Sequence, residues 1–93
     1  LVAESTSYDD LVKAMKDKKF ADVRKWIAKN ADIDSSELFR YFYDNILVLF
    51  EGKSIPNAIL ILAQYQDSAS RVVDQEINNI ACVLEIMSVA QWK

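Results

Sequence analysis

Apolar residues recur along this chain at the spacing of amphipathic helices. Near the start, four of them share one helix face at positions i, i+3, i+4 and i+7: Tyr8, Leu11, Val12 and Met15. Asp9 and Asp10 begin this segment, where carboxylates favour the positive end of the helix dipole. A second amphipathic pattern runs from Phe20 to Lys29, with Val23 on its apolar side and Lys25 on the polar side. The pattern predicts two short, consecutive helices.

The stretch DSSELFRYFYDNILVLFEG predicts a third helix at about residues 35 to 50. Asp34 stands three residues before Glu37, as in an approximate capping box, and Gly52 can take the left-handed backbone angles that end a helix. The expected core stripe is aliphatic and aromatic, with three flanking rings: Leu38, Phe42, Ile46 and Leu49, flanked by Phe39, Tyr43 and Phe50. Because most of the aromatic mass falls here, we expect this helix at the centre of the domain.

Two more apolar segments follow, each with a signal for where its helix begins. Ser54 can cap a fourth helix that runs to about Arg71, and Asp74 can cap a fifth that runs to about Ala90. Trp92 lies near the chain end, where we expect fraying. The sequence therefore predicts five helices.

The fourth and fifth helices carry more apolar surface than one small core requires. Gln66 falls inside a broad apolar arc and needs a partner or a wet seam, whereas Leu60 and Gln64 lie in the polar sector. The fifth helix has two apolar faces: one carries Ile77, Ile80, Val83, Leu84 and Met87, and the other carries Cys82, Ile86, Val89 and Ala90. Such a helix can be buried at the centre of the core, or it can contact a partner protein. Both hold if one face packs in the core and the other binds the partner. We expect a subunit interface that contains Leu60, Gln64, Gln66, Cys82, Ile86 and Val89.

Composition supports one all-α domain. The 93 residues include one Gly and one Pro, so the turn residues that hairpins need are almost missing. The net charge of −3 gives no overall basic field for phosphates, which argues mildly against nucleic-acid contact by this domain. The run KAMKDKKF permits a phosphate-binding patch, but Asp17 interrupts it and a solvated lysine face is the commoner explanation.

Candidate catalytic and metal-binding chemistry is sparse. The chain has no histidine, no glycine-rich phosphate loop and a single cysteine, so we expect no catalytic residue, no cofactor site and no metal site within it. Cys82 lies mid-helix and fits a small buried hydrophobe better than a reactive thiol. The chain begins at Leu1, without a leader or a run of about 20 apolar residues, so we expect a cytoplasmic piece of a longer protein, away from membranes.

At this point three stretches resemble a known family. SIPNAILILAQYQDSASRVVDQEINNIACVLEIM, preceded by DLVKAMKDKKFADVRKWIAKN and SSELFRYFYDNI, resembles the C-terminal collar domain of the large ATPase subunit of the sliding-clamp loader of T4-like bacteriophages. The likeness runs from about Tyr8 to Ala90 and includes no catalytic motif. SASRV at 68 to 72 is only superficially similar to the family's Ser-Arg-Cys finger.

The resemblance implies a five-helix collar domain at residues 8–93 and a linker remnant of an upstream AAA+ module at residues 1–7. It implies that collars hold the loader subunits in a pentameric ring. The upstream modules would bind ATP and Mg, open the sliding clamp and place it on primer-template DNA. Localisation would then be the cytoplasm of an infected bacterial host.

A different class of function also fits the residues. An independent helical adaptor would bind a partner helix in a groove near Leu60 or Ile86. An enzymatic function would require a constellation of side chains that the sequence does not offer.

Overall fold

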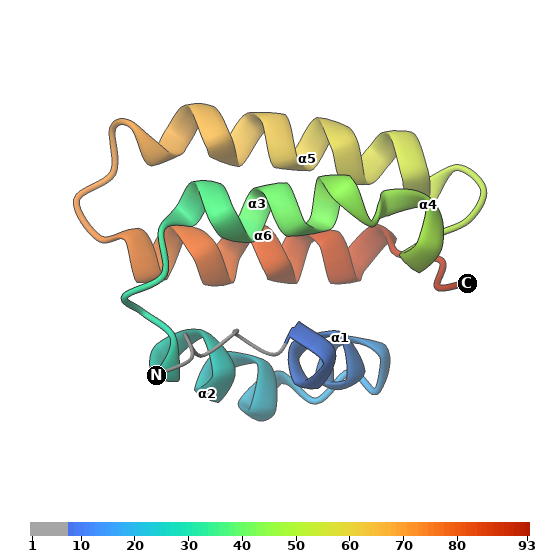
Figure 1. The fold of residues 1–93 in the computed structure, drawn as a ribbon, viewed down its shortest axis with the longest axis horizontal. Helices are drawn as coiled ribbons and strands as arrows, with labels where there is room; N and C mark the ends of the chain where they lie inside the picture. Colours follow the sequence, from blue (N-terminus) through green and yellow to red (C-terminus); the bar gives the residue numbers. More distant parts are fainter. Residues whose placement is uncertain (1–7) are drawn as a thin grey trace, which may run out of the picture.

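The computed structural model describes residues 8–93 and confirms the all-helical prediction for that part of the chain. Its helices are α1 (Tyr8–Lys16), α2 (Phe20–Lys29), α3 (Ser35–Asp44), α4 (Ile46–Leu49), α5 (Ser54–Ala69) and α6 (Gln75–Val89). Helices α3, α5 and α6 lie along the long axis of the domain, and α1 with α2 forms a layer beneath them (Figure 1). The predicted linker at residues 1–7 lies outside the described residues.

The predicted third helix is divided at Asn45. The Asn45 side-chain amide donates to the Tyr41 carbonyl at 2.8 Å, and the Asn45 backbone amide donates to the same oxygen at 3.1 Å. Asparagine competes in this way with the helical hydrogen-bond ladder, so α3 ends here. The short α4 follows, and it leaves Ile46 and Phe50 buried but Leu47 and Val48 exposed.

Two of the three predicted helix caps are confirmed. The Asp34 side chain accepts from the Ser36 amide at 3.1 Å, and Asp74 accepts from the amides of Glu76 and Ile77 at 2.9 and 3.3 Å. Ser54 is instead the first helical residue of α5, and its buried hydroxyl donates to the Glu51 carbonyl at 2.6 Å. The cap prediction for Ser54 is therefore wrong, because this hydroxyl holds the preceding turn instead.

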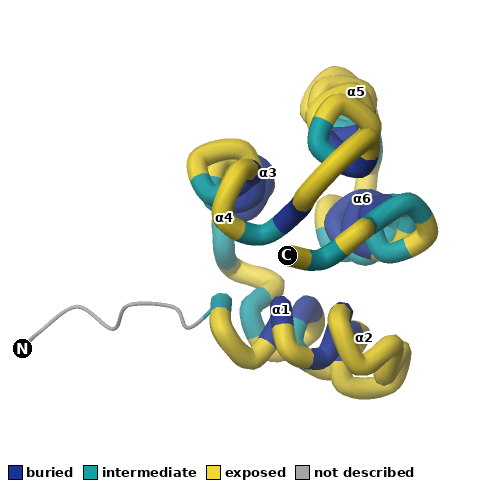
Figure 2. Tube along the Cα trace, turned by 90° about the vertical axis from the view of Figure 1, so that its right-hand side faces the viewer, coloured by how far each residue is buried: buried dark blue, intermediate teal, exposed yellow. Residues whose placement is uncertain are grey.

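The core lies between the two layers. Helix α6 packs against α5, α2 and α3, and Figure 2 shows the buried segments of these helices turned toward one another. Large, fully buried side chains come from α1, α2, α3, α6 and the α4–α5 connection: Leu11, Met15, Val23, Leu38, Phe42, Phe50, Val83 and Ile86. The helix predicted to be central is thus one wall of the core, and α6 has the more central position.

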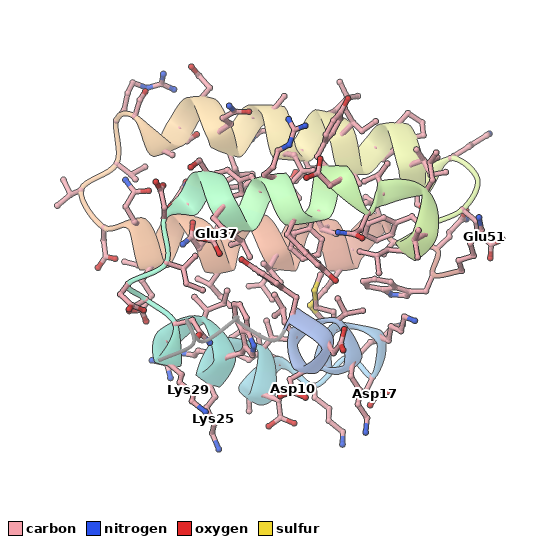
Figure 3. All side chains as sticks on the ribbon, in the orientation of Figure 1. Asp10, Asp17, Lys25, Lys29, Glu37 and Glu51 are labelled. Carbon is pink, nitrogen blue, oxygen red and sulfur yellow. The ribbon has the colours of Figure 1, made fainter. Side chains whose placement is uncertain are left out.

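An aromatic cluster fastens the lower layer to α3. The Tyr8 ring stacks on Tyr41 with centroids 4.1 Å apart and lies 5.4 Å from Trp26. Charged side chains of the same layer, among them Asp10 and Lys25, point away from α3, α5 and α6 (Figure 3). Helices α1 and α2 therefore have one face in the core and one in solvent.

The C-terminus is held rather than frayed. The Trp92 ring lies 4.8 Å from that of Phe50, and backbone bonds at 2.9 Å join Glu51 to Gln91 and Lys93 to Leu49. Gly52 makes the nearby turn at φ +63°, where an added Cβ would stand 2.8 Å from the Gln91 side-chain oxygen. The expectation that Trp92 frays is wrong, whereas the special role of Gly52 is confirmed.

Lys18 occupies a position that favours glycine. Its φ is 57°, and it follows α1 in a Schellman arrangement, with amides of Lys18 and Lys19 donating to Met15 and Ala14. We expect Lys18→Gly to raise the free energy of unfolding by about 1 kcal/mol, because glycine adopts this angle without a Cβ penalty. Urea unfolding followed by circular dichroism measures it.

The matched control is Lys25→Gly, in the exposed face of the α2 interior. That change should lower the free energy of unfolding by about 1 kcal/mol, because glycine is a poor helix former. If both substitutions destabilise the protein equally, the left-handed assignment at Lys18 is refuted.

Candidate protein-interaction surface

Buried polar contacts fix which side of α6 faces inward. The Ser35 hydroxyl at the start of α3 donates to the Gln75 side-chain oxygen at 2.9 Å and also lies 2.9 Å from the Asn79 oxygen. Ser35 and Asn79 are both buried, so separating them would leave polar groups unsatisfied inside the domain. This contact therefore turns the Asn79 side of α6 toward α3.

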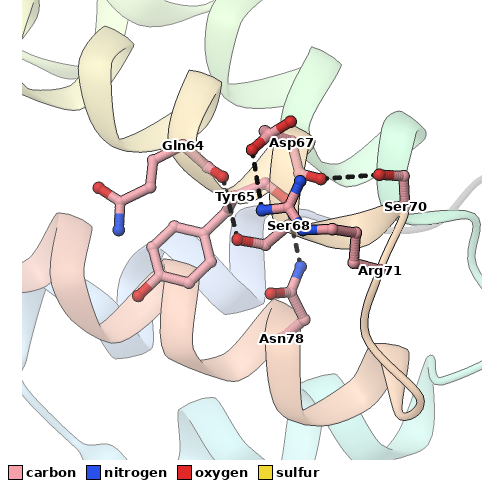
Figure 4. Close-up of polar contacts among 7 residues, drawn as sticks. All are labelled: Gln64, Tyr65, Asp67, Ser68, Ser70, Arg71 and Asn78. Carbon is pink, nitrogen blue, oxygen red and sulfur yellow. Dashed lines mark hydrogen bonds and ion pairs between the residues drawn. The ribbon is translucent and has the colours of Figure 1, made fainter.

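A second pair of contacts sets α6 against α5. The Tyr65 hydroxyl donates to Glu85 at 2.7 Å. The Asn78 amide donates to the Tyr65 carbonyl at 3.3 Å, as Figure 4 shows. The bond to Glu85, and to a lesser extent burial, raises the pKa of Tyr65 to about 12. Together the two contacts determine which residues of the α5–α6 pair remain outside.

The inward rotation overturns part of the predicted interface. Cys82 is 1% exposed and Ile86 is 0% exposed, so neither can touch a partner while the domain is folded. The core takes Cys82 and Ile86 from one predicted apolar face and Val83 from the other. Periodicity finds both faces but does not say which one the core takes, and here the polar contacts of Asn79 decide.

The other face of α6 supplies the exposed apolar surface. Ile77 is 64% exposed and Leu84 36% exposed, at positions i and i+7 with the partly exposed Ala81 between them. Val89, also predicted for the interface, is partly buried. We call Ile77, Ala81 and Leu84 the outer stripe of α6.

Helix α5 carries two further residues of the predicted interface, and both are exposed. Leu60 is 68% exposed, and Gln64 lies one turn further along on the exposed side of the helix. Figure 2 shows the outer half of α5 exposed over most of its length. A large leucine on this side forms no part of the domain core.

Gln66 lines a groove between α3 and α5. The groove has a volume of about 600 Å³, with Phe39 and Leu62 among its apolar lining residues and Arg40 among the polar ones. Gln66 is exposed there, which agrees with the expected wet seam. The groove is a second concave surface beside the apolar outer side of the α5–α6 pair.

Sequence reasoning missed the exposed residues Leu47 and Val48 on α4. The signal that could have found them is their place on the helix, since both fall outside the expected core stripe that contains Ile46 and Leu49.

Arg71 belongs to a local surface contact. It pairs with Asp67 at 2.9 Å across one helical turn, and the Ser70 hydroxyl donates to the Asp67 carbonyl (Figure 4). The bond to Arg71 lowers the pKa of Asp67. These contacts lie where α5 ends.

Residues 8–93 also bear on metal binding and on membrane spanning. In that part of the chain, no three carboxylate or thiol side chains gather to hold a metal ion. Within the same residues, the helices lack the combination of length and apolarity that a bilayer span requires. Comparison with protein-family models and with curated proteins finds no match to this chain.

Cys82 gives a direct test of this arrangement. Burial, with a smaller effect of Glu85, raises the pKa of the thiol to about 12. Since the thiolate is the reactive form, we expect iodoacetamide at pH 8.5 to label the native protein about 100-fold more slowly than the urea-unfolded protein. The labelled fraction is measured by mass spectrometry over time.

The control is Ser88→Cys in a Cys82→Ala background, which places the thiol at an exposed position of the same helix. It should react at nearly the unfolded rate. Because the native pKa of Cys82 is above its unfolded value, its contribution to stability is complete below about pH 9 and is lost as the pH rises toward 12. Equal native and unfolded labelling of Cys82 would contradict its buried position.

Proposed function

We propose that this domain is a non-catalytic assembly domain that holds subunits together through the outer side of its α5–α6 pair. The observation that carries the proposal is the set of large aliphatic side chains left outside the core on these helices: Leu60, Ile77 and Leu84. Large apolar side chains left in solvent on one helix pair are candidates for protein–protein contact. Cys82 faces the core and takes no part in this surface.

Magnitudes favour assembly within a larger protein. Covering the exposed parts of these three side chains contributes on the order of 2 to 5 kcal/mol. Association of free molecules costs about 4 to 15 kcal/mol, so this surface alone gives weak binding. Linkage to other contacting modules raises the effective concentration and makes such weak contacts sufficient.

The finer proposal follows the family resemblance: the domain is the collar of a sliding-clamp loader. Other loader subunits in a pentameric ring would be its direct partners. The ATP and Mg sites, the sliding clamp and the primer-template DNA would belong to upstream AAA+ modules. Weak contacts of this kind are sufficient between subunits that other modules already hold together, and this supports the collar proposal.

The test uses the full gene product, including whatever precedes Leu1. We expect an upstream phosphate loop, and we expect Leu60→Asp with Leu84→Asp to abolish subunit assembly in native mass spectrometry while ATP binding by each subunit persists. Asn57→Asp, an exposed polar position on α5, is the matched control and should assemble normally. Unchanged assembly of the double variant would refute the proposal.

The α3–α5 groove favours a second candidate, an independent adaptor that binds a partner helix. Ala63→Trp would fill this groove and leave Leu60 itself unchanged. Loss of partner binding by that variant, in a gene product with no upstream phosphate loop, would select the adaptor over the collar.

A further inference from the structure

The charges of this domain are strongly segregated. Residues 13–29 hold seven cations and two aspartates, a net charge of +5 within a chain of net charge −3. In the described part of the chain, ion pairs join Arg40 to Asp44 and Arg71 to Asp67, and none involves these seven cations. All seven are exposed, and Lys16 also lies over the Trp92 ring, 5.8 Å from its centroid. We call the exposed cations of α1, α2 and their connection the basic face: Lys13, Lys16, Lys18, Lys19, Arg24, Lys25 and Lys29.

Carboxylates gather at one end of the helical layer above. Residues 30–39 and 72–84 contain five acids and no Lys or Arg, a net charge of −5. The Ser35–Gln75 bond joins the two segments, and Figure 1 shows both connections at the same end of the domain. These carboxylates define the acidic end: Asp32, Asp34, Glu37, Asp74 and Glu76.

Each charged region also exposes a large apolar side chain. Phe20, between Lys19 and Arg24 in sequence, is half exposed, and Val73, beside Asp74, is fully exposed. Specific protein interfaces commonly combine an apolar centre with a charged rim. The two regions are therefore opposite in charge, and each offers an exposed apolar side chain.

The basic face suits a protein partner better than a nucleic acid. A groove of about 340 Å³ between α1 and α2 is lined by four lysines but also by Asp10, Asp17 and Asp22. Asp10 and Asp17 point to the same side of the domain as Lys25 and Lys29 (Figure 3). A uniformly anionic phosphate backbone would meet these carboxylates, whereas a protein surface can place polar or apolar groups against them.

We propose that the basic face of one copy docks on the acidic end of a second copy. The inference rests on the proposed assembly function and names the copy-to-copy contact within it. Such a contact is heterologous, so every copy keeps one basic face and one acidic end for further neighbours. Repetition then produces a ring or an open chain, with the outer side of the α5–α6 pair adding apolar contact.

Two charge variants of the 93-residue chain test the contact. Lys25→Glu with Lys29→Glu changes the basic face from +5 to +1, and Asp32→Lys with Glu76→Lys changes the acidic end from −5 to −1. The second pair spares Asp74, which caps α6. Lys53→Glu, an exposed position outside both regions, is the control.

We expect sedimentation at low ionic strength to show self-association that weakens at least about tenfold between 0.05 and 0.5 M salt. Each charge variant alone should associate about tenfold more weakly than the unaltered protein, while the control does not change. An equimolar mixture of the two variants should recover association, because an intact basic face then meets an intact acidic end.

Association that is independent of salt and of both variants overturns the proposal, as does a mixture that fails to recover. If the basic-face variant loses binding to a DNA duplex while its self-association is unchanged, the face serves nucleic acid and the proposal is refuted. If the charge variants do not change self-association, the proposed role of Leu60 and Leu84 in the full gene product is not affected. If the substitutions at Leu60 and Leu84 do not change assembly, the result of mixing the charge variants still holds.

Discussion

Replacing Ile86 with aspartate is expected to unfold this domain rather than to detach it from a partner. The side chain is 0% exposed and belongs to the central cluster that joins α6 to the other helices. The substitution removes an aliphatic group from the core and places a carboxylate there without a neighbouring cation. We expect a loss of at least about 4 kcal/mol in the free energy of unfolding, a large part of the 5 to 15 kcal/mol typical of a domain.

Urea unfolding followed by circular dichroism measures this loss, and Leu84→Asp is the matched control. Leu84 lies two residues away on the outer stripe of α6, where the new carboxylate stays hydrated, so its substitution should cost no more than about 1 kcal/mol. If Ile86→Asp remained folded while Leu84→Asp unfolded, the orientation assigned to α6 would be wrong. The pair thus tests the point on which sequence and structure disagree.

That disagreement shows what helical periodicity can and cannot predict. The spacing of apolar residues located all five predicted segments, because each helix must bury a stripe of its surface. It could not rank the two apolar faces of residues 75 to 89. The deciding residues are polar: Asn79 bonds to Ser35 inside the domain, and a hydrophobic projection gives such a residue no weight.

Local polar chemistry explains the remaining structural differences. The side chain of Asn45 ends α3 one turn before the apolar run does, so the predicted third helix is divided into α3 and α4. Of the candidate interface, Leu60, Gln64 and Gln66 lie on the exterior, as a polar sector or a wet seam would require. Cys82 and Ile86 are buried instead. Which side of α6 turns inward depends on its contact with Ser35, and helical periodicity contains no information about that contact.

The distribution of charge along the sequence contains information that the net charge hides. The net value of −3 suggested no field that attracts anions, yet it averages over a region of +5 and a region of −5. Long-range steering depends on the charge that a partner meets at close range, since screening removes contributions beyond about 10 Å at ordinary salt. The fold separates the two regions, and therefore the average is a poor guide to binding.

The second large expected effect concerns Phe50, which closes the end of the domain. Its ring is fully buried and lies 4.8 Å from that of Trp92, while the backbone beside it pairs with the last residues of the chain. We expect Phe50→Ala to lower the free energy of unfolding by about 3 to 5 kcal/mol, because it leaves a cavity where few side chains can relax. Tyr43→Ala, an exposed aromatic on α3, should cost less than about 1 kcal/mol.

A double-mutant cycle with Trp92→Ala separates the ring contact from the cavity. The two rings should couple by about 0.5 to 1.5 kcal/mol, so the double variant should lose less stability than the sum of the single losses. Urea unfolding of the four proteins gives this coupling. Strict additivity would mean that the C-terminal residues are not held by Phe50, and the expectation of a frayed end would then be right after all.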